Sequence, residues 1–173
     1  MEQNRDLDRE RAEDPVADLP NCNTGRYLRE ILIAVDGPGD EVRPSEIADR
    51  LDVTPASVTG MTGRLAAAGY VDHEPYGGIS LTAKGARMAR HVQWRQCVLQ
   101  QFFSTYLDVE VPESASYPAS FALPVEAIRR LREVVDIECV DECDERVWSE
   151  ECECRDPLES TSLSAPGIDD SSA

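Results

Sequence analysis

One stretch of the chain places hydroxyl groups and a single guanidinium on one side of an expected helix, residues 55–68. The side chains on that side are small and uncharged, apart from the arginine: Ser57, Thr59, Gly60, Thr62, Gly63 and Arg64. A solvated helix normally carries Glu and Lys instead, so this surface suits close approach by another molecule. A helix fits the major groove of duplex DNA, where Ser, Thr and Arg reach base edges and phosphates.

A second group of chemically active residues lies near the C-terminal end. Four cysteines fall within sixteen residues: Cys139, Cys143, Cys152 and Cys154. Thiolate clusters bind Zn(II), Cu(I) or an iron–sulfur cluster, although this spacing departs from the paired Cys-x2-Cys of a zinc knuckle. A redox switch is the main alternative, but neighbouring acids would raise the pKa of the thiols and lower their reactivity. The sequence therefore predicts a transition-metal site (Zn, Fe or an iron–sulfur cluster), with redox sensing and no role as alternatives.

The elements before the helix 55–68 would hold it in place. Residues 26–35 repeat apolar side chains at helical spacing and end in a turn rich in Gly and Pro. Ser45 is the expected N-cap of a second, short helix. Thr54 is expected to cap the next helix, and Pro55 to take its first position, where a missing N–H has no cost.

A hairpin follows the third helix. Residues 70–74 and 79–82 alternate apolar and polar side chains around a turn that contains Pro and Gly. Short helices, a small-polar third helix and a hairpin in this order predict a winged helix-turn-helix, with Arg43, Tyr76 and Gly77 facing phosphates. The alternative is a small helical core that carries a hairpin and has no role on DNA.

The rest of the ordered chain is predicted to be helical. Apolar residues between Thr82 and Leu107 predict one helix of about 39 Å, which is long enough to pack against a second subunit; the alternative is a core helix within one chain. Residues 108–118 are expected to form a loop. Val125, Ile128, Leu131 and Val135 form the apolar side of a last helix.

Four short segments carry a resemblance to a known family. They are residues 27–32 (YLREIL), 45–59 (SEIADRLDVTPASVT), 69–71 (GYV) and 81–85 (LTAKG). With these segments the chain resembles the diphtheria-toxin-repressor family of iron- and manganese-dependent regulators over about residues 24–137. The resemblance implies a mainly α homodimer, with a winged helix-turn-helix DNA-binding domain and a helical dimerisation domain that controls DNA binding through Fe(II) or Mn(II). The multiple-antibiotic-resistance type of regulator, which shares the winged helix, is the nearest alternative.

The metal site that the resemblance implies is not matched in this chain. The family uses acidic residues on the first helix, a His at the centre of the long helix with a carboxylate nearby, and a Glu-His element that opens the next helix. The matching positions here hold Arg26, Arg29, Gln96 and Gln100, with Ser120-Phe121 in place of Glu-His. Arg is a permanent cation and Gln offers only a neutral oxygen. We therefore expect the Mn/Fe site to be lost.

The net charge of −17 is concentrated at the two ends of the chain. Residues 1–20 and 133–173 are strongly acidic, whereas the middle is nearly neutral, and Lys84 is the only lysine. Abundant acids with almost no lysine are typical of halophilic proteins, whose acidic surfaces stay hydrated in concentrated salt. An ordinary protein with acidic tails is the alternative.

These patterns define the expected organisation. The parts are a disordered acidic N-terminus (1–20), the winged helix-turn-helix (21–82), the helical dimerisation domain (83–137), a Cys-rich acidic segment (138–156) and a disordered tail (157–173). Membrane-spanning and secretory segments are not apparent, so a cytoplasmic protein is expected. The motifs of common enzymes are also missing. A transcriptional regulator that binds double-stranded DNA as a homodimer is therefore the main hypothesis, and a winged helix that binds only proteins is the alternative.

Overall fold

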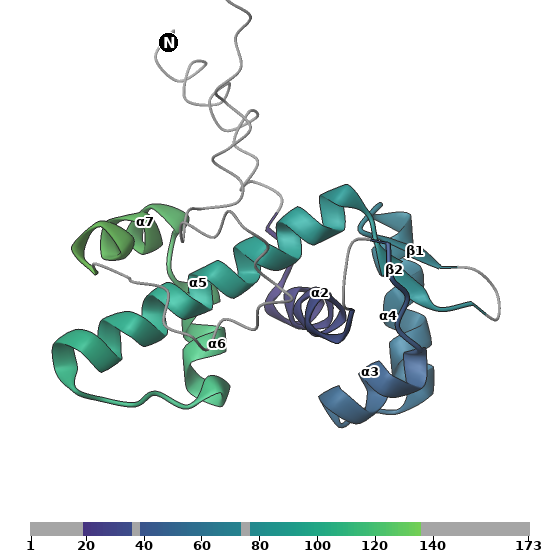
Figure 1. Ribbon diagram of the computed structural model, residues 1–173, viewed down its shortest axis with the longest axis horizontal. Coiled ribbons are helices and arrows are strands. Elements are labelled where there is room, and N and C mark those ends of the chain that lie inside the picture. Colours follow the sequence, from purple (N-terminus) through teal and green to yellow (C-terminus); the bar gives the residue numbers. More distant parts are fainter. Residues whose placement is uncertain (1–18, 36–38, 74–76, 136–173) are drawn as a thin grey trace, which may run out of the picture.

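The computed structural model describes residues 19–35, 39–73 and 77–135, and the fold within them is mainly helical (Figure 1). The elements in chain order are α2 (Cys22–Ala34), α3 (Pro44–Leu51), α4 (Pro55–Ala67), β1 (Val71–His73), β2 (Ile79–Leu81), α5 (Ala83–Leu107), α6 (Glu113–Ala122) and α7 (Val125–Val134). The long helix α5 runs from α4 and the two strands at one end of the molecule to α6 and α7 at the other, with α2 lying against it (Figure 1). The predicted winged helix-turn-helix, followed by further helices, is confirmed.

Local capping explains where the helices of the winged unit begin. Helix α2 starts four residues earlier than expected, because the Asn21 side chain accepts a hydrogen bond from the backbone N–H of Thr24. The Thr54 cap and Pro55 at the start of α4 are confirmed. The expected Ser45 cap is wrong, since α3 begins at Pro44 with Arg43 at the cap position and no side-chain cap. A proline needs no N–H partner in a first turn, so it can open the helix before a serine does.

The wing is a two-stranded antiparallel sheet in which Val71 pairs with Leu81 and His73 with Ile79. A bridge from Val42 to Ile79 ties it to the segment before α3. The wing also rests on the start of α5. A Cβ at Gly85 would lie 1.8 Å from the Tyr70 carbonyl oxygen, so only glycine allows this approach.

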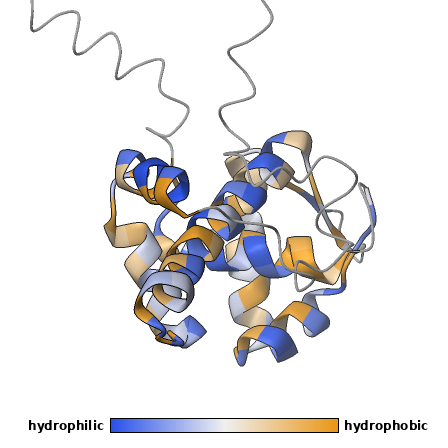
Figure 2. Ribbon diagram, turned by 60° about the vertical axis from the view of Figure 1, so that its left-hand side comes forward, coloured by the Kyte–Doolittle hydropathy of each residue, from blue (hydrophilic) through white to orange (hydrophobic). Residues whose placement is uncertain are grey.

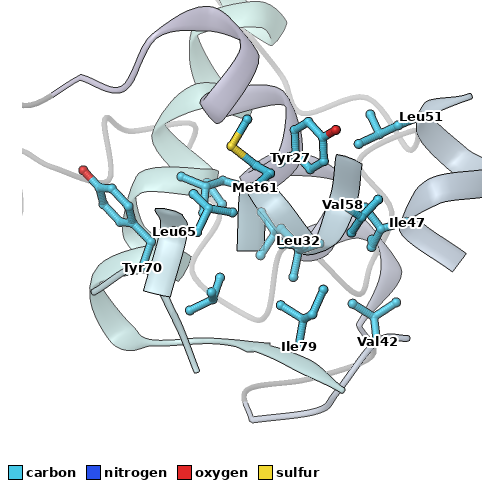
Figure 3. Close-up of a cluster of buried hydrophobic side chains, with 14 of the residues drawn as sticks. Tyr27, Leu32, Val42, Ile47, Leu51, Val58, Met61, Leu65, Tyr70 and Ile79 are labelled. Carbon is cyan, nitrogen blue, oxygen red and sulfur yellow. The ribbon is translucent and has the colours of Figure 1, made fainter. Parts of the chain in front are cut away.

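One continuous apolar core holds the winged unit together (Figure 3). Leu28 and Ile31 of α2, Ile47 of α3 and Val58 of α4 are among its fully buried members. Met88 of α5 belongs to the same core. The expected boundary between residues 82 and 83 therefore falls inside a packed unit, because the first turns of α5 complete the core of the winged helix.

The second half of the molecule contains a helix that the sequence analysis missed. Residues 108–118 were expected to form a loop, but α6 occupies Glu113–Ala122 and contains Pro118. A proline normally breaks a helix interior because it lacks an N–H. Here the Tyr117 hydroxyl donates to the backbone oxygen of Cys22, and the ring packs beside Phe121, so tertiary contacts hold the helix around the proline.

The last helix follows its predicted pattern. Ile128 and Val135 are buried, and Ile128 packs with Trp94 and Val98 of α5 in a small second cluster. Hydrophobic and hydrophilic bands alternate along the helices, as expected for amphipathic helices that cover a core (Figure 2). No helix among the described residues has the length and apolar character needed to cross a bilayer.

Candidate nucleic-acid interface and interhelical polar junction

The outward face of α4 is open and carries the residues that the sequence singled out. Ser57, Thr59 and Arg64 are exposed, and so are Gly60 and Gly63, at which an added Cβ would meet nothing within 4 Å. Within the part of the chain that the structure describes, no carboxylate pairs with Arg64. Small side chains on a helix with an exposed guanidinium in its last turn leave room for a duplex to approach the backbone closely.

Thr62 does not belong to this face. Its side chain is 1% exposed, and its hydroxyl donates to the carbonyl of Val58, one turn earlier, at 2.9 Å. The expectation that Thr62 points outward is therefore wrong. The helical angle places residue 62 next to Val58, and a threonine can be buried there because its hydroxyl bonds back to its own helix.

The expected phosphate contacts are only partly described. Arg43 is exposed just before α3, and Gly77 is half-buried at the end of the wing turn. The neighbouring Gly78 N–H donates to the Glu41 carboxylate at 3.1 Å. Tyr76 lies outside the described residues, as do all four clustered cysteines, 139, 143, 152 and 154.

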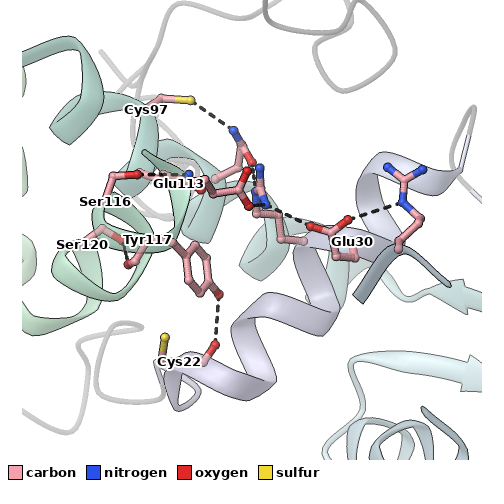
Figure 4. A network of polar contacts seen from close by, with 11 residues as sticks. Cys22, Glu30, Cys97, Glu113, Ser116, Tyr117 and Ser120 are labelled. Atoms are coloured by element: carbon pink, nitrogen blue, oxygen red, sulfur yellow. Dashed lines mark hydrogen bonds and ion pairs between the residues drawn. The ribbon is translucent and has the colours of Figure 1, made fainter. Parts of the chain in front are cut away.

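A partly buried network of charged and polar side chains joins α2 to α3, α5 and α6 (Figure 4). The Arg29 Nη1 lies 3.0 Å from a Glu30 oxygen and 2.6 Å from a Glu113 oxygen, and Arg29 Nε donates to Gln93 Oε1. The second Glu30 oxygen lies 3.4 Å from Nε of Arg50 on α3. Arg29 and Glu30 are about nine-tenths buried, whereas Glu113 is half exposed. Two carboxylates therefore converge on one guanidinium nitrogen.

Polar contacts also position α6 on α5. The guanidinium of Arg95, which is 1% exposed, donates to the carbonyl oxygens of Ser120 and Leu123, at the C-terminal end of α6. Helix ends leave such carbonyls without partners, and a cation is favourable there. The Gln96 amide nitrogen lies 3.5 Å from Ser116 Oγ. Arg95 therefore caps α6 from the side of α5.

Burial changes the acidity of two groups at the contact between α2 and α6. Burial raises the pKa of the Tyr117 hydroxyl far above its usual value, which keeps the group protonated as a donor to Cys22. Desolvation also raises the pKa of the Cys22 thiol, partly opposed by the positive charge of Arg26. The Gln93 amide nitrogen donates to the Cys97 Sγ at 3.2 Å, and Cys97 and Cys22 lie far apart in this network (Figure 4).

Comparison with known proteins identifies the family. Residues 22–79 match the iron dependent repressor N-terminal DNA binding domain. An uncharacterised HTH-type transcriptional regulator of Methanocaldococcus jannaschii is 30% identical over 108 residues, which cover 61% of this chain and 86% of the relative. The chain belongs to the iron-dependent repressor family. The resemblance inferred from the sequence is thereby confirmed.

Solved structures of this repressor family share the fold. A manganese-dependent transcriptional repressor in complex with manganese matches with a TM-score of 0.58 at 23% identity, over 65% of this chain and 52% of that one. IdeR of T. acidophilum matches with a TM-score of 0.56 at 20% identity, over 65% and 54%. ScaR with bound Zn2+ gives 0.56 at 20% identity, over 68% and 54%. The chain spans about half the length of each of these structures.

The residues at the positions of the repressor family's metal site do not fit a divalent cation. Arg29, already paired with two carboxylates, stands where an acidic ligand is expected, and Arg26 is exposed nearby. Gln96 is buried and offers a neutral oxygen. Among the described residues, no group of three or more His, Cys, Asp or Glu could hold a metal ion.

Sequence reasoning missed most of this junction. Glu30 gave a usable signal, because it lies among the buried residues of α2 and a buried charge must be paired. Glu113 gave none, since it lies 84 residues from Arg29. Only the folded chain brings these two side chains together.

Proposed function

We propose that this member of the iron-dependent repressor family is a transcriptional regulator that binds double-stranded DNA with the outward face of α4. The observation that carries the proposal is the open face of Ser57, Thr59, Gly60 and Gly63 beside the exposed Arg64. The hydroxyls and the guanidinium would contact base edges, while Arg43 and the wing residues Tyr76 and Gly77 would contact phosphates.

Substitution of Arg64 tests this interface directly. Arg64→Ala should weaken specific duplex binding by roughly 1–3 kcal/mol and leave the fold intact. The matched control is Arg130→Ala, which removes another exposed arginine side chain, on α7. Footprinting titrations and circular dichroism of both variants give the comparison. Equal affinity of wild type and Arg64→Ala would remove this residue from the interface.

The glycines of α4 allow a second test that separates binding from folding. Gly63→Ala should stabilise the helix by about 0.5–1 kcal/mol, because alanine loses less backbone entropy and the site is open. The added methyl group would nevertheless stand between the helix and the groove and reduce duplex affinity. A variant with greater stability and unchanged affinity would argue against close approach at this face, and would favour a winged helix that binds only proteins.

The salt concentration matters for the duplex-binding measurements, because the acidic ends of the chain are typical of a halophilic protein. Counterion release contributes less to DNA binding as the salt concentration rises. Contacts from hydroxyl groups and close packing must then supply more of the affinity, which fits the composition of the α4 face. Duplex binding should therefore be measured across a salt series.

We also propose that the functional unit is a homodimer. Apolar side chains about half exposed gather where α5 ends beside α7: Tyr106, Leu107, Val109 and Val134. The Tyr106 hydroxyl donates to the Val134 backbone oxygen, which makes them one surface. Light scattering should give about twice the 19.1 kDa of one chain, and Leu107→Asp with Val134→Asp should shift it to the monomer. A monomeric wild type at micromolar concentration would reject the dimer.

The effector, if the regulator has one, is proposed to act through the cysteines and not through the repressor family's Mn/Fe positions. Support comes from the poor fit of Arg29 and Gln96 to a metal and from the dense thiols Cys139, Cys143, Cys152 and Cys154. Thiolates prefer softer metals. A variant with all four changed to Ser should lose metal that anaerobically purified wild type retains. Equal metal content in the two proteins would reject the thiol site.

A further inference from the structure

The charged junction around Arg29 differs in kind from the other ion pairs described in this structure. Arg130 on α7 also has two carboxylate partners, Glu126 and Glu133, but all three belong to one helix and are more than half exposed. Such surface pairs contribute little. The Arg29 side chain is 10% exposed and spans elements far apart in the chain. Removing one member of a buried pair leaves a charge without compensation and is strongly destabilising.

The junction connects the helices that must keep a fixed relation for DNA binding. Arg50 on α3 meets Glu30 on α2, and Arg29 on α2 meets Glu113 on α6 and Gln93 on α5. These contacts begin at α3, the helix that precedes α4, and end at α5 and α6. The orientation of α4 relative to α5 and α6 is therefore linked to the Arg29 contacts.

Without Arg29, two carboxylates would face each other at the junction. Glu30 and Glu113 both point at the same guanidinium nitrogen, and Glu30 is nine-tenths buried. Carboxylates that converge repel each other unless one of them is protonated or a cation lies between them. The chain supplies that cation covalently as Arg29, while Arg50 of α3 contacts the second Glu30 oxygen.

We propose that the Arg29 guanidinium is a built-in substitute for a bound metal: it joins α2 to α5 and α6 permanently and makes the orientation of the winged helix independent of divalent cations. Arg29 is thus a positioning residue for the DNA contact, and this inference rests on the proposed function only for its DNA readout. A bound metal stabilises in proportion to its free concentration, whereas a covalent cation is always present. Control by an effector must therefore act elsewhere in the molecule.

The test uses the full-length chain and a set of matched variants. Arg29→Gln removes the charge, Glu113→Gln removes only the half-exposed carboxylate, and Arg130→Gln is the control. Hydrogen exchange of residues 113–122 reports the junction without DNA. We expect the hydrogen-exchange rate of these residues to rise roughly tenfold in Arg29→Gln, which lies within the usual range of coupling between sites. The rate should rise less in Glu113→Gln. In Arg130→Gln it should stay within about twofold of the wild-type rate. Unchanged exchange in Arg29→Gln would overturn the proposal.

Duplex binding is then measured in EDTA and in Mn(II). Wild type should bind equally in both, and Arg29→Gln should lose roughly tenfold in affinity in both. Arg29→Glu should bind poorly in EDTA and recover in Mn(II), because it leaves converging carboxylates that a divalent cation can neutralise. The proposal that Arg29 takes the place of a metal would be overturned if duplex binding by the wild type depended on Mn(II). It would also be overturned if Mn(II) did not restore duplex binding to Arg29→Glu. A wild type that binds no duplex would instead reject the proposed function, while the exchange data still test the junction.

Discussion

The two halves of the molecule are held together by different forces. The winged unit shares one cluster of seventeen buried apolar residues, which includes the start of α5. The cluster beneath α7 has only three fully buried members, Trp94, Val98 and Ile128. What the second half has instead is buried polar side chains, including Arg95, Ser116 and Ser120. Apolar packing dominates the first half, and directional hydrogen bonds specify the second.

This difference has consequences for tolerance to change. Hydrophobic burial is non-directional and tolerates exchanges that keep volume. A buried hydrogen bond depends on the partner's position, and losing one partner costs the desolvation of the other. The stability of the second half should therefore depend more on its buried polar groups, and the stability of the first half more on its apolar volume.

The largest expected effect compares two fully buried aliphatic residues. Leu28→Ala in the large core should lower the free energy of unfolding by about 3–5 kcal/mol, and Ile128→Ala in the small cluster by about 2–3 kcal/mol, because partly exposed neighbours can collapse into the smaller cavity. Denaturant titrations followed by circular dichroism measure both. An equal or greater loss in Ile128→Ala would erase the distinction between the two cores.

The next effect concerns the buried cap of α6. Arg95→Leu keeps much of the apolar volume but leaves the Ser120 and Leu123 carbonyls without this donor. Unfolding free energy should fall by about 2–4 kcal/mol, and hydrogen exchange should rise first in α6. Arg130→Leu on the surface is the control and should leave both measurements unchanged. A neutral Arg95→Leu would show that the second half is held by its apolar cluster.

A smaller effect is expected where α2 meets α6. At Gly25, a Cβ would lie 2.5 Å from Phe121 Cζ and 3.0 Å from the Tyr117 hydroxyl. Gly25→Ala should therefore destabilise the protein by about 1–3 kcal/mol through overpacking, although alanine favours a helix. Gly60→Ala, at an open site in α4, should instead stabilise it. Combining Gly25→Ala with Phe121→Leu should recover stability; failure to do so would place the strain elsewhere.

The smallest effect is the loss of one hydrogen bond. Tyr117→Phe keeps the ring but removes the donor to Cys22, at a cost of about 0.5–1.5 kcal/mol. Because burial raises the pKa of Tyr117 in the folded state, the phenol of the unfolded chain loses its proton first, near pH 10. Stability should therefore fall as pH rises above about 10. The stability of Tyr117→Phe should fall less steeply with pH in that range. Identical slopes of stability against pH in the variant and the wild type would contradict a role for Tyr117 in this pH dependence.

The winged unit was largely predictable because its signals are local. Apolar spacing, the Thr54 cap, Pro55 and the alternating hairpin identify its elements within a few residues. The errors were local as well. Asn21 extends α2, Pro44 opens α3 ahead of Ser45, and Thr62 turns inward because its hydroxyl can bond to Val58.

The second half was less predictable because its structure depends on distant partners. A proline at position 118 favours a loop from local rules, but contacts with α2 and the Arg95 cap stabilise a helix there. No pattern within 113–122 contains that information. The roles of Glu113 and Gln93 likewise follow only from the way α5 and α6 approach α2.

The sequence by itself determined the family and the winged helix-turn-helix, because these depend on residue types at short spacing. Tertiary structure alone decided the surroundings of Arg29. It buries Arg29 between Glu30 and Glu113, which are separated by most of the described chain. A charge becomes decisive only where folding removes water and brings its partners together, and neither burial nor long-range proximity can be read from residues in order.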